Sequence, residues 1–551
     1  MVTSTQIPHI VRRVIGQALG IPWGNVRVIK PYIGGGFGNK QDVLYEPLNA
    51  FLTTQVGGRP VKLDISREET FCNTRTRHSI EFDLAAGVGK DGRLLAKDMH
   101  SYSNQGAYAS HGHAIAANGL TSWRLQYACP NIRGEAYTIY TNTPVGGAMR
   151  GYGIPQVCFA IESFMDDVAN EIHMDPLEFR RKNLIQGYYE DAYLKPIAAN
   201  TNGIFECLEK GAEYIHWDEK RKEYAEQAGD VRKGVGMALF SYKTGVWPIS
   251  LEIAGARLSL NQDGSVQLML GATEIGQGAD TVFSQMVAET LHTDMEHVHI
   301  KTVQDTDVSP FDTGAYASRQ SFVTGTAVRH CAEILRDKIL AYAKTLLPEI
   351  DTRELTLKDN WIWAGDEQAI SLAALAEESY YSLTNSSVLT AEVSEQVKKN
   401  TIATGCCFAE VEVDIKLGKI KILHIINVHD SGKLLNPQLA EMQVHGGMSM
   451  GMGYGISEQL ILDEKTGRPL NGNLLDYKLM TMLDTPDIKA DFVELCDPMG
   501  PYGNKALGEP PAIPCAPAIR NAVLHATGVA FYENPLTPQR LIDGFKKAGL
   551  I

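Results

Sequence analysis

The sequence predicts a fold in the α+β class, with helices and mixed sheets. Segments with helical spacing of apolar residues and segments with alternating apolar residues follow one another along the whole chain, without a repeat period. Hydrophobic residues make up 44% and charged residues 21% of the 551 residues, which is ordinary for a globular protein. A chain of this length exceeds one ordinary domain, so we expect at least two large domains.

Helical and extended segments alternate in the first part of the chain. Apolar residues at helical spacing from Ile7 to Leu19 predict an amphipathic helix, and residues 25–33 (NVRVIKPYI) alternate like a strand. A later helical pattern is expected to break at Pro176, because proline cannot donate a hydrogen bond within a helix. The further elements expected here are a helix, two strands and the helix that Pro176 interrupts, over residues 43–54, 80–88, 94–102 and 161–184.

A very polar stretch, residues 214–233, is the best candidate for a boundary between domains. Its composition is typical of a solvated helix followed by a linker. We therefore predict a first domain over residues 1–225 and a second over residues 226–551. In the second domain we expect strands over 256–270 and 409–428 and helices over 281–293, over 326–347 and from 438 onward.

The charge balance excludes some classes of partner. Lys and Arg number 51 and Asp and Glu number 65, so the net charge is −14. An acidic chain without a long basic run is a poor candidate for binding nucleic acid or an anionic membrane. No apolar run approaches the roughly 20 residues of a membrane span, and the N-terminal pattern is an amphipathic helix rather than a signal peptide.

The nine cysteines predict buried free thiols. Their number is odd and none forms a C-x-x-C pair, so a disulfide framework, an iron–sulfur cluster and a thiolate zinc site within this chain are all disfavoured. The adjacent pair Cys406 and Cys407 is expected to pack in the core. Free thiols favour a reducing compartment, and we expect the protein in the cytoplasm.

Glycine is clustered in five places. Glycine gathers where the backbone must approach a ligand or adopt a positive φ angle. One cluster indicates a turn, whereas five along the whole chain predict a ligand pocket that is assembled from many loops. The clusters lie at residues 34–38, 146–153, 271–278, 446–455 and 503–508.

The first cluster, GGGFGNKQ over residues 34–41, follows a strand pattern and precedes a helix pattern. A nucleotide phosphate loop would need glycine before the lysine and a hydroxyl residue after it, and those places hold Asn39 and Gln41. ATP binding is therefore disfavoured. The backbone N–H groups of such a loop could still hold an anion or a metal-bound oxygen.

Three further loops could contact a ligand, although each could also be a plain turn. Arg150 lies between small residues that would let a ligand reach its guanidinium group. Gln277 lies in a Gly-Gln-Gly turn that leads into a helix pattern, and helix N-termini suit phosphate. Residues 312–319 supply small polar side chains close to another helix pattern.

One carboxylate is a candidate for catalysis, although its segment taken alone is better explained as a surface turn. Glu509 lies between a glycine and two prolines that stiffen the backbone, and a rigidly held carboxylate in a cleft is a candidate general base. His111 and His113 lack further metal ligands nearby, and we expect a plain loop there.

Taken together and in this order, these motifs resemble the molybdenum hydroxylases, the xanthine dehydrogenase and aldehyde oxidase family. The shared features are the GGGFG loop, AMRGYG-x-PQ, the GATE-x-GQG turn, the run around Ala317 and Ser318, and KA-x-GEPP. The resemblance covers nearly the whole chain. It implies two elongated molybdopterin-binding domains with the cofactor at their interface, and a small preceding domain that this sequence lacks.

The resemblance also implies the cofactor, the partners and the chemistry. The cofactor would be molybdenum–molybdopterin in the cytosine dinucleotide form, with 2Fe-2S and FAD carried by an iron–sulfur subunit and an FAD subunit of a hetero-oligomer. Glu509 would take a proton from a molybdenum-bound hydroxyl, and water-derived oxygen would enter an electron-poor carbon. The backbones of Phe37, Arg150 and Ala317 would surround the metal without ligating it. The full set of implied cofactor contacts is Gln6, Gly36, Phe37, Gly38, Arg150, Gly276, Gln277, Gly278, Ala317, Ser318 and Gln443.

The implied substrate residues depart from those of xanthine-oxidising members. Gln41 stands where these usually carry Glu, Asn118 where they carry Arg, and Tyr152 where they carry a stacking Phe. A second stacking Phe is absent, with Val246 or Trp247 nearby. Three functions stay open: an N-heterocycle hydroxylase acting on a purine or related ring, an aldehyde oxidoreductase on the same scaffold, and a cofactor-free, non-catalytic fragment.

Overall fold

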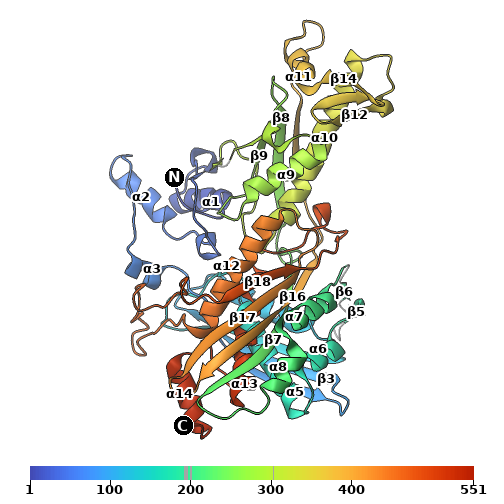
Figure 1. Ribbon diagram of the computed structural model, residues 1–551. Coiled ribbons are helices and arrows are strands. Elements are labelled where there is room, and N and C mark those ends of the chain that lie inside the picture. The colour runs from blue at the N-terminus through green and yellow to red at the C-terminus, as the bar shows by residue number, and fades with distance from the viewer. Residues whose placement is uncertain (191–195, 199–200, 302) are drawn as a thin grey trace.

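The computed structural model describes residues 1–190, 196–198, 201–301 and 303–551. The molecule is elongated, with a broad body that carries a narrower lobe at one end (Figure 1). Residues 253–397 build the lobe, and the N-terminal segment, residues 1–73, lies beside its base. The C-terminus lies at the opposite end of the body.

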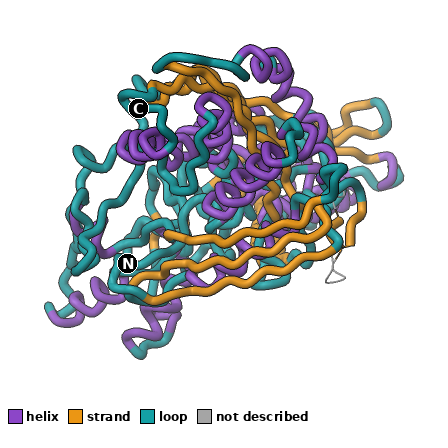
Figure 2. The backbone as a smooth tube through the Cα atoms, turned by 90° about the horizontal axis from the view of Figure 1, so that it is seen from below, coloured by secondary structure: helices purple, strands orange, loops and turns teal. Residues whose placement is uncertain are grey.

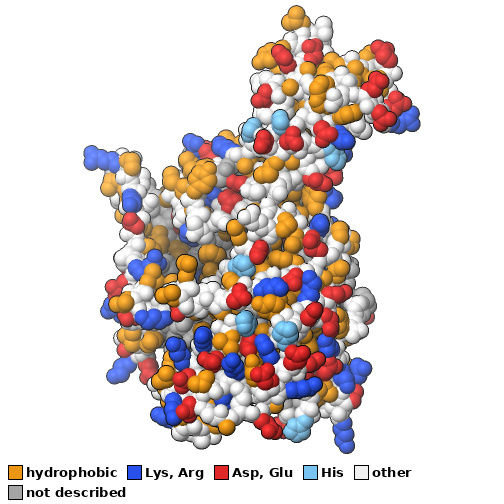
Figure 3. All heavy atoms as spheres, viewed as in Figure 1, with side chains coloured by type: hydrophobic (Ala, Val, Ile, Leu, Met, Phe, Trp, Pro, Cys, Tyr) orange, Lys and Arg blue, Asp and Glu red, His pale blue; other side chains and the backbone are white. Residues whose placement is uncertain are grey.

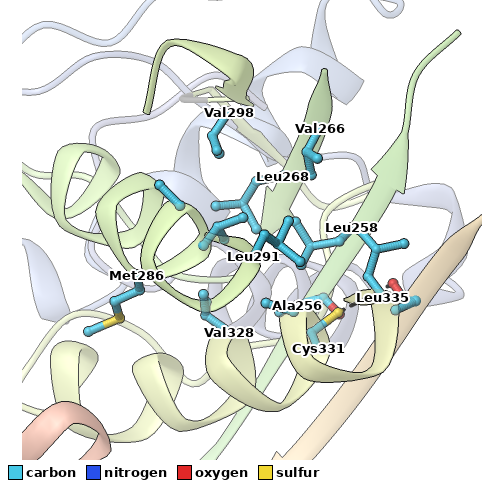
Figure 4. Packing of buried hydrophobic residues seen from close by; sticks show 14 of the residues in the cluster. Ala256, Leu258, Val266, Leu268, Met286, Leu291, Val298, Val328, Cys331 and Leu335 are labelled. Atoms are coloured by element: carbon cyan, nitrogen blue, oxygen red, sulfur yellow. Dashed lines mark hydrogen bonds between the residues drawn. The ribbon is translucent and has the colours of Figure 1, made fainter. Parts of the chain in front are cut away.

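The lobe contains a four-stranded sheet in the order β10-β9-β8-β15, with helices α9 and α10 packed on it. Leu258 and Leu268 of the sheet meet Leu291 of α9 and Leu335 of α10, and all four are fully buried (Figure 4). A small sheet, β12-β13-β14, and helix α11 form the tip. The bounds are β8 Ile253–Leu260, β9 Val266–Leu270, α9 Ala279–Leu291, β10 Val298–Ile300, α10 Gln320–Leu346, β12 Leu355–Lys358, β13 Trp361–Ala364, β14 Glu367–Ser371, α11 Leu372–Tyr381 and β15 Thr390–Gln396.

The body is organised around the sheet β18-β17-β16-β7, which is buried on both faces. Consecutive residues of a strand point to opposite faces, so Cys406 packs with the helices on one side and Cys407 with those on the other. Both thiols are fully buried, and burial raises the pKa of each above its ordinary value. The bounds are β7 Val231–Lys243, β16 Ile402–Asp414, β17 Lys419–Asp430 and β18 Asp487–Phe492.

A layer of helices separates this sheet from a second one, β2-β3-β4 (Figure 2). Within the layer, the buried Arg180 guanidinium donates to Glu162 at 2.9 Å and to Asp166 at 2.6 Å. Buried carboxylates are tolerated only when they are paired in this way. The bounds are β2 Ser79–Val88, β3 Leu94–Gly106, α4 Gly112–Leu125, β4 Asn131–Tyr140, α5 Ile154–Glu171, α6 Pro176–Asn183, α7 Ile204–Ile215 and α8 Trp217–Glu223. A short pair, β5 Tyr188–Glu190 and β6 Pro196–Ala198, follows α6.

Helices α12, α13 and α14 cover the other face of the central sheet. Helix α13 approaches β7 so closely that a side chain at Gly234 or Gly236 would collide with the backbone around Ala522. Glycine is therefore required at these two strand positions by packing. The bounds are α12 Pro437–Ile456, α13 Cys515–Thr527 and α14 Pro538–Lys547.

The N-terminal segment joins the lobe rather than the sheet that follows it in sequence. Strand β1 (Ile29–Lys30) pairs antiparallel with β11 (Gln304–Asp305), far along the chain. The segment also contains helices α1 (Pro8–Leu19), α2 (Glu46–Gln55) and α3 (Arg67–Asn73). Loops from distant parts of the sequence are thereby brought together at the base of the lobe.

The α+β class is confirmed, and most expected elements are present. Pro176 does interrupt the helical pattern, and it begins α6 as the first residue after an Asp175 cap. The strand expected over 25–33 is wrong in extent, because only Ile29 and Lys30 find a pairing partner. The polar stretch 214–233 contains α8 and the start of β7.

All nine cysteines are free thiols, as expected. The expectation that all are buried is wrong for Cys496, which is exposed, and for Cys72, which is half-buried. Among the described residues, no helix is long and apolar enough to cross a membrane.

Candidate cofactor and active site

A cavity of about 1230 Å³ lies where the N-terminal segment, the lobe and the body meet. Figure 3 shows a hollow between the N-terminal segment and the body, with hydrophobic side chains on much of its wall. Loops from all three parts line the cavity, as the scattered glycine clusters suggested. The sequence-predicted residues that line it are Gln6, Gly36, Phe37, Gly38, Gln41, Asn118, Arg150, Tyr152, Gly276, Gln277, Ala317, Ser318, Gln443 and Glu509.

Gln6 holds two of these loops together. Its side chain is buried, its Oε1 accepts from the N–H of Gly38 at 3.0 Å, and its Nε2 donates to the Ala315 carbonyl at 2.5 Å. A side chain at Gly36 would strike the Gln6 amide, so this glycine is needed for the close approach. Gln6 is thus a support for the GGGFG loop as well as a wall residue.

Arg150 is buried, and its guanidinium group donates to backbone carbonyls rather than to a carboxylate. It contacts the Gly508 carbonyl at 2.8 Å and the Gln443 carbonyl at 2.9 Å. Burial lowers the pKa of Arg150 to about 10, although the nearby charge of Glu509 acts in the opposite direction. Among the described residues Arg150 donates to no carboxylate, and a buried cation of this kind suits an anionic ligand.

Several polar groups on the cavity wall have no protein partner. Within the described part of the chain, the backbone N–H groups of Phe37 and Arg150 find no acceptor. Ser431 Oγ and Asn504 Oδ1 are buried at the cavity and also lack a partner. Buried polar groups are rarely left unpaired, so the Ser431 and Asn504 side chains fit a polar ligand that satisfies them, and the two backbone donors are available to the same ligand. Sequence reasoning missed Ser431 and assigned no role to Asn504.

The Gly-Gln-Gly turn is organised from within. Glu274 accepts from the N–H groups of Gly276 at 2.6 Å and Asp280 at 3.0 Å. The Gln277 amide is itself engaged, because its Oε1 accepts from Ile275 at 2.7 Å and its Nε2 donates to Gln320 at 2.6 Å. Glu274 is therefore structural, and Gln277 lines the cavity with an amide that already has partners.

Glu509 lies on the cavity wall with one carboxylate oxygen fixed. Its Oε2 accepts from the Tyr242 hydroxyl at 2.6 Å and from the Gly151 N–H at 3.1 Å, while its backbone N–H donates to Ser318 Oγ at 2.9 Å. Burial raises the pKa of Glu509, and these hydrogen bonds together with the Arg150 charge offset part of the rise. A carboxylate with a raised pKa in a cavity is suited to proton transfer.

The expected substrate residues do not all face the cavity. Gln41 and Asn118 line it, although the Asn118 amide also donates to the Tyr152 carbonyl at 3.0 Å and so supports that residue. Trp247 lies outside the lining, where its carbonyl accepts from Asn400, and Val246 lines the cavity instead. Gly278 also lies outside the lining, at the start of α9.

The expectation of a plain loop at His111 and His113 is wrong, because His113 lies within α4 and the His111 ring has partners on two other loops. Its Nδ1 lies 2.7 Å from the Tyr152 hydroxyl and its Nε2 lies 2.9 Å from Asp42 Oδ1. Asp42, Ser110 and His111 all line the cavity. No sequence motif predicted these contacts, because the residues that make them come from three separate loops. Among the described residues, no cluster of three metal-ligating side chains is present.

Comparison with known proteins agrees with this architecture. The family of molybdopterin cofactor-binding domains matches residues 1–184 and, with its second domain, residues 210–486. The chain is 50% identical to the putative xanthine dehydrogenase molybdenum-binding subunit XdhA of Escherichia coli K12, over all of this chain and 73% of the relative. It is 28% identical to the aldehyde oxidoreductase molybdenum-binding subunit PaoC of the same strain, over 98% of this chain and 71% of the relative.

A solved structure has the same fold. Quinoline 2-oxidoreductase from Pseudomonas putida 86 superposes with a TM-score of 0.91 at 25% identity, over 99% of this chain and 72% of that protein. The matches to both cofactor-binding domains and the 50% identity over the whole chain establish the family that the sequence motifs suggested. The chain belongs to the molybdenum hydroxylase family, as a molybdopterin-binding large subunit.

Proposed function

We propose that this chain is the catalytic subunit of a xanthine dehydrogenase-like enzyme that hydroxylates an electron-poor carbon of a purine or another N-heterocycle, with oxygen derived from water. The observation that carries the proposal is the Glu509 carboxylate, which faces a cavity whose other walls offer unpaired backbone donors. The 50% identity to a putative xanthine dehydrogenase subunit supports the same substrate class.

The residues present fit molybdenum–molybdopterin. The free N–H groups of Phe37 and Arg150, with the Ala317 backbone, would surround the metal end, and the buried Arg150 cation would offset negative charge there. Ser431 and Asn504 would hydrogen-bond the polar pterin or its tail. When bound, the cofactor supplies two-electron redox chemistry and activates a water-derived oxygen.

Glu509 is the proposed base. Tyr242 and Gly151 donate to Oε2, and together with the Ala317 backbone they hold the carboxylate on the cavity wall. The carboxylate takes up one proton as the oxygen nucleophile forms, and its raised pKa matches that task because an acid of higher pKa holds the proton more firmly. Gln6, Gly36, Gly38, Gly276, Gln277, Gly278, Ser318 and Gln443 are proposed to shape the cofactor pocket.

The finer features of the assembly belong to the same proposal. The cofactor would be the cytosine dinucleotide form, and electrons would leave through an iron–sulfur subunit and an FAD subunit, in the cytoplasm. The division into residues 1–225 and 226–551 also remains a prediction, and the two matched domains leave residues 185–209 between them.

An aldehyde oxidoreductase is the second candidate. Asn118 offers no positive charge to orient a purine, and its amide is already engaged with Tyr152. The 28% identity to an aldehyde oxidoreductase subunit favours the same alternative. Turnover of purines, nicotinate and aldehydes by the intact complex separates the two candidates, because oxidation of aldehydes alone would exclude the heterocycle proposal.

Metal analysis tests the third reading, a cofactor-free fragment. Stoichiometric molybdenum in the purified complex would remove that reading. Its absence from a correctly folded complex would remove the catalytic proposal.

A further inference from the structure

A lysine on the cavity wall lacks a carboxylate partner among the described residues. Lys243 is the last residue of β7, is half-buried, and lines the cavity. Its Nζ donates to the Trp247 carbonyl at 3.3 Å. An ammonium group has three N–H donors, so two remain for a ligand or for water.

Lys243 adjoins the surroundings of the proposed base. Tyr242, the preceding residue, also lines the cavity and donates to Glu509 Oε2 at 2.6 Å. On the other side of Lys243 the chain is tied to the cavity wall, because the Gly245 N–H donates to the Ala317 carbonyl at 2.9 Å. A substrate that reaches the base therefore enters a space to which Lys243 also contributes.

The carboxylate whose charge acts on Lys243 is already engaged. Glu252 is buried, its Oε1 accepts from the Val246 N–H at 2.5 Å, and its Oε2 accepts from Arg319 Nε at 2.5 Å. Arg319 also donates to Asp312 at 2.6 Å. Glu252 therefore attracts the ammonium group of Lys243 through space without accepting a hydrogen bond from it.

Among the described residues, two carboxylates line the cavity itself, and both have partners of their own. Asp42 accepts from Arg75 Nε, and the Arg150 charge favours the ionised form of Glu509. Neither depends on Lys243, so the positive charge of this lysine is available to a ligand.

Burial leaves the ammonium group of Lys243 incompletely solvated. Burial lowers the pKa of Lys243, and the charge of Glu252 offsets part of that effect. The cause is that the protein replaces only part of the hydration that burial removes. An anion in the cavity would supply a charge-assisted hydrogen bond, which is stronger than a hydrogen bond between neutral groups. A neutral ligand of the same shape would not.

We propose that Lys243 is an anion-binding residue of the substrate pocket, so that the enzyme prefers N-heterocycles carrying a carboxylate group over neutral ones of the same shape. The inference rests on the proposed N-heterocycle activity and names the charge of its substrate. Lys243 is the specificity-determining residue, and no step of the chemistry requires it.

The test compares two ligands that differ in charge and hardly in shape. Nicotinate and nicotinamide carry a carboxylate and a carboxamide at the same ring position. Dissociation constants are measured by calorimetry with the reduced holoenzyme complex, where no turnover occurs, and kcat/KM is measured with the oxidised complex. In the wild type nicotinate should bind about tenfold more tightly than nicotinamide, the effect of one charge-assisted hydrogen bond.

Lys243→Met keeps the length of the side chain and removes its charge. The preference for nicotinate should then fall below about twofold, because neither ligand finds a cation. Lys243→Arg keeps the charge and should retain a preference for nicotinate. Lys243→Gln covers the case in which Lys243→Met does not assemble, and it should lose the preference in the same way.

Asn400→Ser is the matched control for a structural role of the lysine. Asn400 Nδ2 donates at 2.9 Å to the same Trp247 carbonyl as Lys243, and Asn400 lies outside the cavity lining. If Lys243 acted only by holding that carbonyl, loss of the Asn400 amide would lower the preference as well. We expect Asn400→Ser to keep the preference of about tenfold, as should Lys358→Met, which removes an exposed charge at the tip of the lobe.

Three results would overturn the inference while leaving the proposed function intact. One is a wild type that hydroxylates N-heterocycles without binding nicotinate more tightly than nicotinamide. The second is a preference that persists in both Lys243→Met and Lys243→Gln, and the third is a preference that Asn400→Ser removes as well. A lysine that only stabilised the fold would weaken both ligands equally and leave their ratio unchanged. Failure of the proposed function is distinct, because then aldehydes are turned over and no N-heterocycle is.

Discussion

Replacing Tyr242 with phenylalanine should raise the pKa of Glu509, the proposed base, without removing its carboxylate. The Tyr242 hydroxyl donates to Glu509 Oε2 at 2.6 Å and thereby stabilises the ionised form. A hydrogen bond to a charged group contributes about 1.5–3 kcal/mol, and about 1.4 kcal/mol corresponds to one pKa unit. The Gly151 N–H and the Arg150 charge remain, so we expect a rise of about one unit.

The sign follows from the state in which the base works. Glu509 accepts a proton, so it must be ionised, and kcat/KM falls as pH drops through its pKa. A higher pKa moves that fall to higher pH. The Tyr242→Phe complex should therefore lose activity on the acidic side, with the acid limb displaced upward by about one unit, and approach wild-type activity at alkaline pH.

The assay is the pH profile of kcat/KM for the intact complex, with molybdenum measured on each sample. Tyr140→Phe removes an exposed hydroxyl from β4 and serves as the control. If kcat/KM falls at the same acidic pH in Tyr242→Phe as in the wild type, then Tyr242 does not stabilise the ionised form of Glu509. A loss of equal size at every pH with molybdenum retained would contradict the prediction as well, because that would show the hydroxyl acting on something other than ionisation of Glu509.

Three further predictions concern the base, the cofactor loop and the core. Glu509→Gln should retain molybdenum and lose nearly all turnover at every pH; a variant with most of its kcat would contradict the assignment of the base. Gly38→Ala should lower the molybdenum content severalfold, because φ is 105° and a side chain would meet the Ala148 backbone, whereas Gly24→Ala, with open space around it and no positive φ, should not. Arg180→Met should reduce the free energy of unfolding by about 3–5 kcal/mol, since it leaves two buried carboxylates unpaired, and denaturant unfolding should show no such change for the exposed Arg353→Met.

The sequence predicted the loops of the site far better than the contacts within it. The motifs that carry the family resemblance group Phe37, Arg150, Ala317 and Glu509 at one site, and all four line the cavity. These motifs are glycine-rich or contiguous patterns that can be recognised in a sequence. Contacts between side chains of different loops produce no such pattern in the sequence. Tyr242 lies within a strand pattern that gives no reason to single it out, yet it holds the base.

The neighbouring positions 41 and 42 show the same limit. Sequence comparison drew attention to Gln41, since relatives carry a carboxylate there. The structure adds the carboxylate of Asp42, whose partners His111, Ser110 and Arg75 come from elsewhere in the chain. The residue next to Gln41 therefore places a carboxylate at the cavity, and no local sequence pattern predicts its contacts.

The segment of residues 150–152 links all parts of the site. The Arg150 guanidinium reaches the Gly508 carbonyl next to the base, the Gly151 N–H holds Glu509 itself, and the Tyr152 hydroxyl meets His111. A substitution within these three residues therefore reaches the base and the cavity wall together. Tyr242 lies outside the segment and donates to Glu509, so Tyr242→Phe changes the surroundings of the base while Arg150, Gly151 and Tyr152 keep their own contacts.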